Sequence, residues 1–368
     1  MPRRTSSNGQ PQSVIIADND VVYIWWSIPK KSRNCLGFSS HRIVNDVEED
    51  NGLKATVGFD VNNDPRKSPQ TTDEWPLQTF NWKDLYAPHD KEIKYRITPM
   101  IGDWDNLQPD REQSIITNSI KRTQTYGDLQ VIFNRGLLST QAFSKRGGVE
   151  GVDSQKSARK ILTDPSNEWR KRLAGAMIYN IKTFFKKGKE DGGKFYAALY
   201  ELTDQELIKH LTDADDIEII LSNANSSKTE MVEGKKKQKS VPDGTNLKTR
   251  SALKKLVNQG KLKLYDRMLG SHIGHNKFVV YVDADGNPKS VLTGSTNWTA
   301  TGLCGQTNNM LFINSPDIAN AYLEYWKQLK SDKKQEATLR TWCTQNTSDW
   351  DLNGSNEQLT LWFSPNTK

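Results

Sequence analysis

The first hundred residues contain short stretches in which apolar and polar positions alternate. Turn residues separate these stretches. These stretches are rich in Val, Ile, Tyr and Trp and have the period of two that a strand with one buried face requires. No helical period occurs among them. We expect strands at 14–17, 21–26, 36–39, 41–44, 54–59 and 94–97. Their spacing predicts an all-β sandwich over residues 13–125, after a disordered lead-in at 1–12.

Strand-like runs alternate with helical periods in the next part of the chain. We expect strands at 129–133, 195–200, 217–221 and 310–313, and helices at 166–187, 203–211, 248–258 and 315–329. This alternation predicts an α/β domain over residues 126–345, with a mixed, largely parallel sheet. The predicted fold class is therefore multidomain, with the β-sandwich first. In open sheets of this kind, ligands bind beyond the carboxyl ends of the strands.

Two stretches depart from this alternation. Residues 222–250 have no apolar period and contain three consecutive lysines, so we expect a mobile loop there. These lysines, Lys235, Lys236 and Lys237, form either an ordinary solvated surface or a rim that holds a phosphate backbone. Residues 346–368 form a tail. Its strand-like run at 359–366 either starts a second repeat or covers a sheet edge.

Composition narrows the range of partners. The 368 residues carry a formal net charge of +7 and have a mean hydropathy of −0.74. A positive excess favours polyanions, either nucleic acid or anionic lipid. Three widely spaced cysteines argue against a zinc site and against a disulfide framework. The sequence has no signal-peptide pattern and no apolar run of about 18 residues, so we expect a cytoplasmic protein without a transmembrane segment.

A predicted β-hairpin carries the most distinctive chemistry. The apolar run at 278–282 is followed by turn residues at 285–288 and by a second strand at 291–293. His275 and Lys277 precede the hairpin and share one face, because side chains alternate along a strand. Ser295 and Asn297 follow the hairpin. They are two residues apart, so they would also share one face.

These four side chains fit the chemistry of a phosphodiester. An imidazole can attack phosphorus, and an ammonium, a hydroxyl and an amide can bind the non-bridging oxygens. The four groups are those of His275, Lys277, Ser295 and Asn297. No carboxylates stand at metal-ligand spacing beside them, so we predict chemistry that needs neither a metal nor another cofactor.

The pattern H-x-K, an apolar strand and G-S-x-N resembles the HKD motif of the phospholipase D superfamily. The continuations at 298–303 and 306–309 resemble its phosphodiesterase and nuclease branches, and the resemblance covers roughly residues 129–326. It implies that His275 attacks phosphorus to give a phosphohistidine. A second histidine would protonate the leaving oxygen and then activate water. Lys277 and Asn297, supported by Ser295, would stabilise the charged oxygens.

The family's aspartate and its second histidine are less clear in this chain. Val282 occupies the usual aspartate position, and Asp283 follows one residue later, so it is either catalytic or a turn residue. The other histidines lack the motif's context: His41, His89, His210 and His272. We therefore expect a homodimer that shares one site, or a second motif on a partner chain or on a C-terminal half.

The resemblance and the positive charge together predict a metal-independent nuclease that acts on DNA. The alternatives are a phospholipase or phosphatidyl transferase that acts on lipid phosphodiesters, and a catalytically inactive binding scaffold. The β-sandwich resembles an immunoglobulin- or fibronectin-like module. The candidates for substrate binding are Asn246, Gln306 and Asn308, together with Lys235, Lys236 and Lys237.

Overall fold

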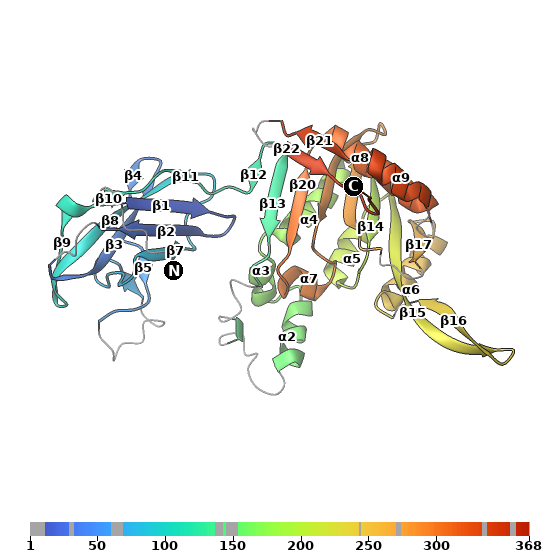
Figure 1. Ribbon diagram of the computed structural model, residues 1–368, viewed down its shortest axis with the longest axis horizontal. Coiled ribbons are helices and arrows are strands. Elements are labelled where there is room, and N and C mark those ends of the chain that lie inside the picture. Colours follow the sequence, from blue (N-terminus) through green and yellow to red (C-terminus); the bar gives the residue numbers. More distant parts are fainter. Residues whose placement is uncertain are drawn as a thin grey trace. The chain divides into compact units, whose positions relative to one another are not determined.

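The computed structural model describes residues 12–28, 33–59, 69–136, 143–144, 154–242, 244–269, 274–332, 337–353 and 358–367. The chain forms two compact units, Met1–Gln124 and Thr125–Lys368, which Figure 1 shows in blue to cyan and in green to red. His272 and the predicted lead-in up to residue 11 lie outside the described residues.

The first unit is built from strands, as predicted. A three-stranded sheet contains β1 (Gln12–Ala17), β2 (Val22–Ser27) and β7 (Asn81–Asp84). A six-stranded sheet contains β3 (Cys35–Val44), β4 (Val47–Glu48), β8 (Glu92–Asp103), β9 (Asn106–Pro109), β10 (Ile115–Ile116) and β11 (Ile120–Lys121). The short strands β5 (Lys54–Ala55) and β6 (Gln70–Thr71) pair with each other, and η1 (Arg111–Gln113) is a single 3₁₀ turn.

One hydrophobic core joins the two larger sheets of this unit. Ile24 and Trp26 of β2 belong to the same buried cluster as Phe38 of β3 and Tyr95 of β8. The strand expected at 54–59 is shorter, because β5 ends at Ala55 and the exposed side chains that follow have no core to face. Two sheets that share a core account for the alternating pattern of the sequence.

The second unit contains a nine-stranded mixed sheet. Its strands run in the order β12-β13-β20-β19-β18-β14-β15-β16, with β17 also paired to β15. Their bounds are β12 (Thr125–Tyr126), β13 (Leu129–Phe133), β14 (Lys194–Leu199), β15 (Ile217–Val232), β16 (Lys235–Pro242), β17 (Lys263–Leu269), β18 (Lys277–Val282), β19 (Pro288–Gly294) and β20 (Asn309–Ile313).

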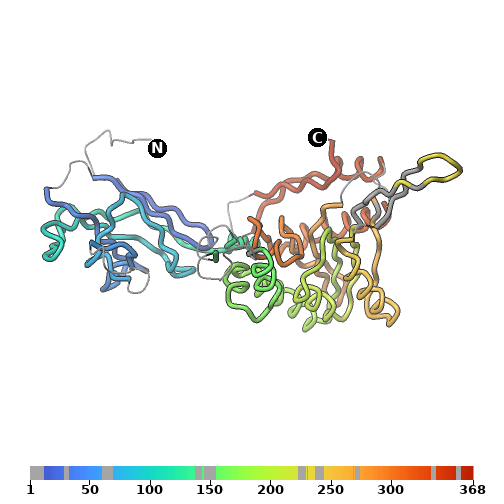
Figure 2. The backbone as a smooth tube through the Cα atoms, turned by 90° about the horizontal axis from the view of Figure 1, so that it is seen from below, coloured from blue at the N-terminus to red at the C-terminus, as the bar shows by residue number. Residues whose placement is uncertain are grey.

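Helices cover both faces of this sheet (Figure 2). The helices of the unit are α2 (Ser154–Thr163), α3 (Glu168–Ala174), α4 (Met177–Glu190), α5 (Gln205–Thr212), α6 (Leu247–Asn258), α7 (Ala300–Cys304), α8 (Pro316–Ser331) and α9 (Ala337–Gln345). Val279 and Tyr281 of β18 belong to the core on the side of α3 to α7, whereas Phe278 and Val280 belong to the core on the side of α8 and α9. Burial on both faces explains why this strand is an unbroken apolar run.

Three details differ from the prediction. The parallel part of the sheet is smaller than expected, because only β14, β15 and β17 run parallel among the described pairings. The helix expected at 166–187 is two helices, since Gly175 adopts a left-handed φ of 59° and ends α3. The loop expected at 222–250 is largely a hairpin of β15 and β16.

The C-terminal strand-like run also has a definite place. β22 (Gln358–Leu361) pairs with β21 (Ser348–Asp351) in a separate two-stranded sheet. Leu361 and Phe363 lie in the core on the side of α8 and α9. This segment therefore covers a helix-bearing face of the unit and does not pair with an edge of the nine-stranded sheet.

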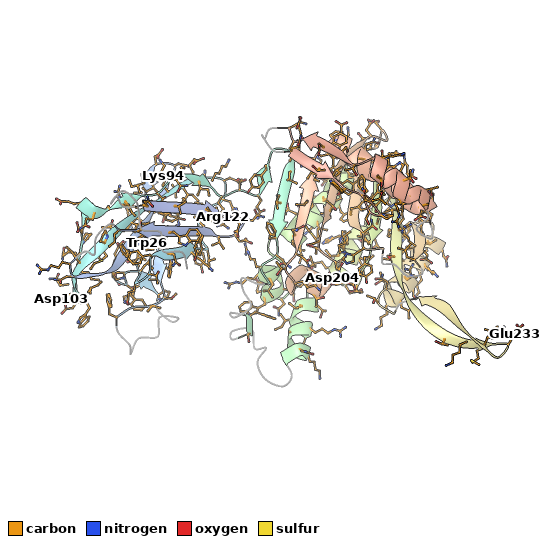
Figure 3. The ribbon with its side chains drawn as sticks, viewed as in Figure 1. Trp26, Lys94, Asp103, Arg122, Asp204 and Glu233 are labelled. Carbon is orange, nitrogen blue, oxygen red and sulfur yellow. The ribbon has the colours of Figure 1, made fainter. Side chains whose placement is uncertain are left out.

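A buried ion pair links α3 to the start of α5. The Arg170 side chain is 1% exposed and donates to both carboxylate oxygens of Asp204, over 2.9 and 3.0 Å. Asp204, labelled in Figure 3, also accepts a hydrogen bond from the Leu207 N–H over 3.1 Å and so caps α5. Glu206 also accepts from Arg170 over 2.8 Å.

Replacing Asp204 with Ala should destabilise the second unit strongly. The variant leaves a buried guanidinium with only Glu206 and a backbone carbonyl as partners, and such losses cost about 3 to 5 kcal/mol. Urea unfolding followed by the circular dichroism of the helices measures the change. Glu168→Ala, which removes the exposed pair with Lys171, is the control and should cost less than about 1 kcal/mol. Equal losses in both variants would contradict the importance of the buried pair.

Candidate functional site

The candidate site lies at one edge of the nine-stranded sheet. In the register, Leu199 at the end of β14 pairs with Lys277 at the start of β18. β19 ends at Gly294, which pairs with Met310 near the start of β20. The residues that follow β14 and β19 therefore meet those that precede β18 and β20. This edge also holds the carboxyl ends of the parallel strands, where a ligand was expected.

Lys277 is a buried cation at this edge. The residue is only 7% exposed, because its position continues the buried face that includes Val279. Its Nζ donates to the His275 carbonyl over 3.0 Å and lies 5.4 Å from the centre of the Tyr200 ring. Burial lowers the pKa of Lys277 to about 8, while the charge of Glu201 opposes the shift. No carboxylate of the described residues lies within ion-pair distance of this ammonium.

His275 stands beside this cation and is exposed. Its ring meets the Tyr200 ring nearly edge-on, with the ring centres 4.7 Å apart. Partial burial, and then the positive charge of Lys277, lower the pKa of His275 from its ordinary value of 6.5. The imidazole is therefore mostly neutral at neutral pH and keeps a nitrogen lone pair for attack.

Ser295 is held by a network of amides. Its Oγ donates to Asn308 Oδ1 over 3.1 Å and accepts from the Asn309 N–H over 3.0 Å. Asn308 is 8% exposed and donates to the carbonyl of Gly302 and to Gln306 Oε1. Ser295, Asn308 and Gln306 are thus linked by hydrogen bonds.

Gly294 makes this arrangement possible. Its φ of 130° lies in the left-handed region, and a Cβ at this position would come within 2.5 Å of the Asn309 carbonyl oxygen. Only glycine lets the end of β19 approach β20 so closely. A glycine therefore precedes Ser295 for a structural reason. The close approach that it allows places Ser295 against Asn309.

Glu201 is a site residue that the sequence analysis missed. Asn297 Nδ2 donates to Glu201 Oε2 over 2.7 Å, and the Glu201 carbonyl accepts from the Trp298 N–H over 3.1 Å. Asn297 Oδ1 is buried and has no hydrogen-bond partner among the described residues. The position of Glu201, just after the buried strand at 195–200, was the signal that could have identified it, because ligands bind beyond such strand ends.

Asn246 bonds to the backbone, whereas the sequence predicted a substrate-binding residue. Its side chain is almost fully buried, and Nδ2 donates to the carbonyls of Tyr200 and Ser222 over 2.7 and 3.1 Å. Its Oδ1 accepts from the Leu202 N–H over 2.9 Å. The amide therefore satisfies the backbone on both sides of Glu201 and connects the ends of β14 and β15.

Asp283, which the sequence allowed as a catalytic residue, has a structural role. It follows β18 at the opposite end from His275, and it accepts a hydrogen bond from the Asn287 N–H over 2.8 Å. Its carboxylate pairs with Lys289 over 2.9 Å. Asp283 thus stabilises the hairpin turn, which was the alternative interpretation of this residue.

The three candidate lysines lie outside the cluster. Lys235, Lys236 and Lys237 are on β16, whose hairpin with β15 ends near Glu233 in Figure 3. Lys235 and Lys236 are exposed.

The cluster contains one histidine among the described residues. His41 bonds to Asp73 and His89 to Arg122 in the first unit, and His210 lies near the end of α5. His, Cys, Asp and Glu side chains form no group of three or more that could hold a metal ion within the described ranges. In the same ranges, no helix has the length and apolar character to cross a membrane.

A family comparison identifies the second unit. Residues 192–330 match the family described as the PLD-like domain of cardiolipin synthase. This stretch contains Glu201, Asn308 and the motif from His275 to Asn297. Residues 192–330 of the second unit therefore form a phospholipase D-like domain, which confirms the predicted resemblance at this level. No curated protein matches the chain.

Some solved structures resemble part of the chain. The phospholipase D family member Nuc from Salmonella typhimurium is 19% identical, with a TM-score of 0.29, over 42% of this chain and 86% of that one. NucT from Helicobacter pylori is 13% identical, with a TM-score of 0.27, over 41% and 88%. Yeast tyrosyl-DNA phosphodiesterase is 15% identical, with a TM-score of 0.22, over 36% and 28%.

Replacing Glu201 with Gln should lower the pKa of Lys277 further. The Glu201 charge opposes the effect of burial on this ammonium, so its removal should move the titration midpoint below about 8. Carbon NMR of labelled lysine side chains measures the midpoint directly and needs no substrate. Glu168→Gln, on the exposed surface of α3, serves as the charge-matched control. An unchanged Lys277 midpoint in Glu201→Gln would contradict the electrostatic coupling.

Proposed function

We propose that the chain is a metal-independent phosphodiesterase that cuts nucleic acid, DNA above all, through a phosphohistidine. The observation that carries the proposal is a neutral, exposed imidazole next to a buried ammonium that has no carboxylate at ion-pair distance among the described residues. His275 supplies the nucleophile, and Lys277 supplies a positive charge that is largely buried. A charge in such a site stabilises a developing phosphorane far more than the same charge in water.

The reaction has two displacements. A lone pair of His275 forms a bond to phosphorus, and the bond from phosphorus to the leaving oxygen breaks. Lys277 and the second N–H of the Asn297 amide bind the non-bridging oxygens, while Glu201 holds the first N–H. A second imidazole gives its proton to the leaving oxygen. It then takes a proton from water, whose oxygen displaces His275 from phosphorus.

The second imidazole is proposed to come from another copy of the chain. The described residues place one histidine in the cluster, so the two-displacement chemistry requires another source. A two-fold arrangement would bring two His275 side chains into one shared site. A partner chain that carries its own H-x-K motif would serve equally well.

The distribution of charge supports a polyanionic substrate. Residues 125–368 contain 35 Lys and Arg against 27 Asp and Glu, whereas residues 1–124 contain 16 against 17. The positive excess therefore lies entirely in the unit that carries the site, as binding of a nucleic-acid backbone requires.

A lipid phosphodiesterase or phosphatidyl transferase is the second candidate, because the matched family is named for cardiolipin synthase. The immunoglobulin- or fibronectin-like identity of the first unit is also proposed, and its two sheets around one core support it. A cytoplasmic location completes the proposal, supported by the free state of Cys35, Cys304 and Cys343.

His275→Ala should remove DNA cleavage without unfolding the chain. The loss of the nucleophile should reduce turnover at least about 1000-fold, measured with a fluorescent DNA substrate in excess EDTA. His210→Ala is the matched control, because this histidine lies on α5 outside the cluster. Full activity of His275→Ala would overturn the mechanism. Vesicle phospholipid cleavage without DNA cleavage by the unmodified chain would support the second candidate.

The pH profile of kcat/KM should be bell-shaped. Activity should decline at acid pH, because attack needs neutral His275, whose pKa is depressed below 6.5. Activity should decline on the alkaline side because the second imidazole must carry the proton that it gives to the leaving oxygen, and it should decline further as pH rises through about 8, because Lys277 then loses its proton and its positive charge. Steady-state assays in EDTA across this range test both limbs. A profile that stays flat through the alkaline side would exclude a role for the Lys277 charge.

Mixing experiments should reveal whether two copies share a site. If each site needs His275 from two chains, activity should fall with the square of the unmodified fraction when His275→Ala chains are added. Sites confined to one chain would instead give a linear decline. Sedimentation should show an assembly of twice the 41.8 kDa chain mass. A linear decline with a monomeric mass would exclude the shared site.

A further inference from the structure

Tyr200 is the first residue after β14, and its ring lies against both groups that the proposed reaction uses. The centre of this ring is 4.7 Å from the centre of the His275 ring, with an angle of 62° between the two planes. The Lys277 Nζ lies over the same ring, 5.4 Å from its centre. Lys277 also donates to the His275 carbonyl over 3.0 Å. Each of the three residues therefore contacts the other two.

The backbone on both sides of the Tyr200 ring is fixed. Asn246, which precedes α6, donates to the Tyr200 carbonyl over 2.7 Å and accepts from the Leu202 N–H over 2.9 Å. From the residues that follow β19, the Trp298 N–H donates to the Glu201 carbonyl over 3.1 Å. The segment that carries the ring is thus attached to α6 and to the chain beyond β19, so the ring has a definite place in the site.

We propose that Tyr200 is a positioning residue of the candidate site, whose ring fixes the imidazole of His275 and keeps the ammonium of Lys277 charged. The expected effect on turnover rests on the proposed function, whereas the effect on Lys277 can be measured without any substrate. Tyr200 itself takes no part in bond formation and acts through the two groups that do.

The ammonium of Lys277 depends on weak and distant partners for its charge. The residue is 7% exposed, and burial lowers its pKa to about 8, while the charge of Glu201 opposes the shift. Glu201 bonds to Asn297 over 2.7 Å, so its charge acts on the ammonium from further away. The face of an aromatic ring has a negative potential, and it attracts a cation most strongly where the cation has lost its water. The Tyr200 ring therefore offsets part of the cost of burial.

The same ring restrains the nucleophile. The pKa of His275 is lowered by partial burial and then by the positive charge of Lys277, and no hydrogen bond of its imidazole occurs among the described residues. Its contact with Tyr200 is nearly edge-on, which is a favoured arrangement of two rings. Attack on phosphorus needs an aligned lone pair, and a displacement of about 1 Å can cost roughly 100-fold in rate. The ring of Tyr200 is thus placed to keep the imidazole aligned.

The first test measures the titration midpoint of Lys277 in the full chain by carbon NMR of labelled lysine side chains. Tyr200→Leu keeps apolar bulk but removes the ring, so the midpoint should fall by about one pH unit. Tyr200→Phe keeps the ring and should leave the midpoint close to that of the unmodified chain. The control is Tyr196→Leu, which removes another ring of β14 that faces Lys194 over 5.2 Å and should not affect Lys277.

A graded series separates the charge effect from simple filling of space. Phenylalanine analogues with one, two or three ring fluorines at position 200 weaken the negative potential of the ring face stepwise and change its volume little. The Lys277 midpoint should fall with each added fluorine. The series also decides the question if Tyr200→Leu does not fold. A midpoint that stays constant along the series would overturn the proposed effect on Lys277.

The second test measures cleavage of a fluorescent DNA substrate in excess EDTA. Tyr200→Leu should lower kcat between about ten- and a hundred-fold with little change in KM, because the ring acts on the reacting groups and not on the substrate. Tyr200→Phe should retain most of the activity. Equal losses of kcat in Tyr200→Phe and Tyr200→Leu would assign the effect to the hydroxyl and overturn the role of the ring.

The two tests separate this proposal from the proposed function. A Lys277 midpoint and a kcat that are both unchanged in Tyr200→Leu, while the unmodified chain cuts DNA, would remove the role of Tyr200 alone. Absence of cleavage by the unmodified chain, with a Lys277 midpoint that follows the fluorine series, would remove the nuclease and leave Tyr200 as the group that keeps the ammonium charged.

Discussion

A lysine ammonium buried at the end of a strand, with no carboxylate within ion-pair distance among the described residues, is the constraint on which the site depends. Desolvation of a charge is costly, and proteins usually offset it with an ion pair. Lys277 has a backbone carbonyl and the face of Tyr200 as its nearest polar and aromatic partners. The cost is tolerated because β18 is fixed between β14 and β19 by two cores. An anionic ligand would supply the missing partner, which is why the geometry favours a phosphate.

Glu201 modifies the electrostatic environment of the Lys277 ammonium. A carboxylate in direct contact would neutralise Lys277 and compete with a phosphate. Glu201 instead bonds to Asn297, so its charge acts on the ammonium from a greater distance while it orients a second donor. Asn246 holds the backbone on both sides of Glu201, so a buried amide outside the reacting groups determines where the carboxylate lies.

The sequence predicted the β-rich first unit, the mixed sheet and the meeting of His275 with Lys277, because these features follow from local periods and from alternation along one strand. It missed the break between α3 and α4, since the apolar period continues across Gly175 and only the left-handed φ ends the helix. It also missed the hairpin of β15 and β16, because residues 222–250 have no hydrophobic alternation to detect. The sequence analysis assigned Asn246 to the site and missed Glu201 for a similar reason. Which polar side chain serves the backbone and which serves the site depends on contacts between distant strands.

The hydrogen bonds of Ser295 indicate whether Ser295 or His275 is the nucleophile of the proposed reaction. The only hydroxyl proton of Ser295 is donated to Asn308 Oδ1, and the oxygen also accepts from the Asn309 N–H. The orientation of Asn308 is fixed in turn, because its Nδ2 donates to the Gly302 carbonyl. No imidazole therefore receives the Ser295 proton, as an activated serine would need. His275 already has a lone pair at neutral pH, since its pKa is depressed. The same network excludes Ser295 as the nucleophile in the proposed mechanism and uses its only proton within the chain, so Ser295 positions the end of β19 and leaves the phosphate oxygens to Lys277 and Asn297.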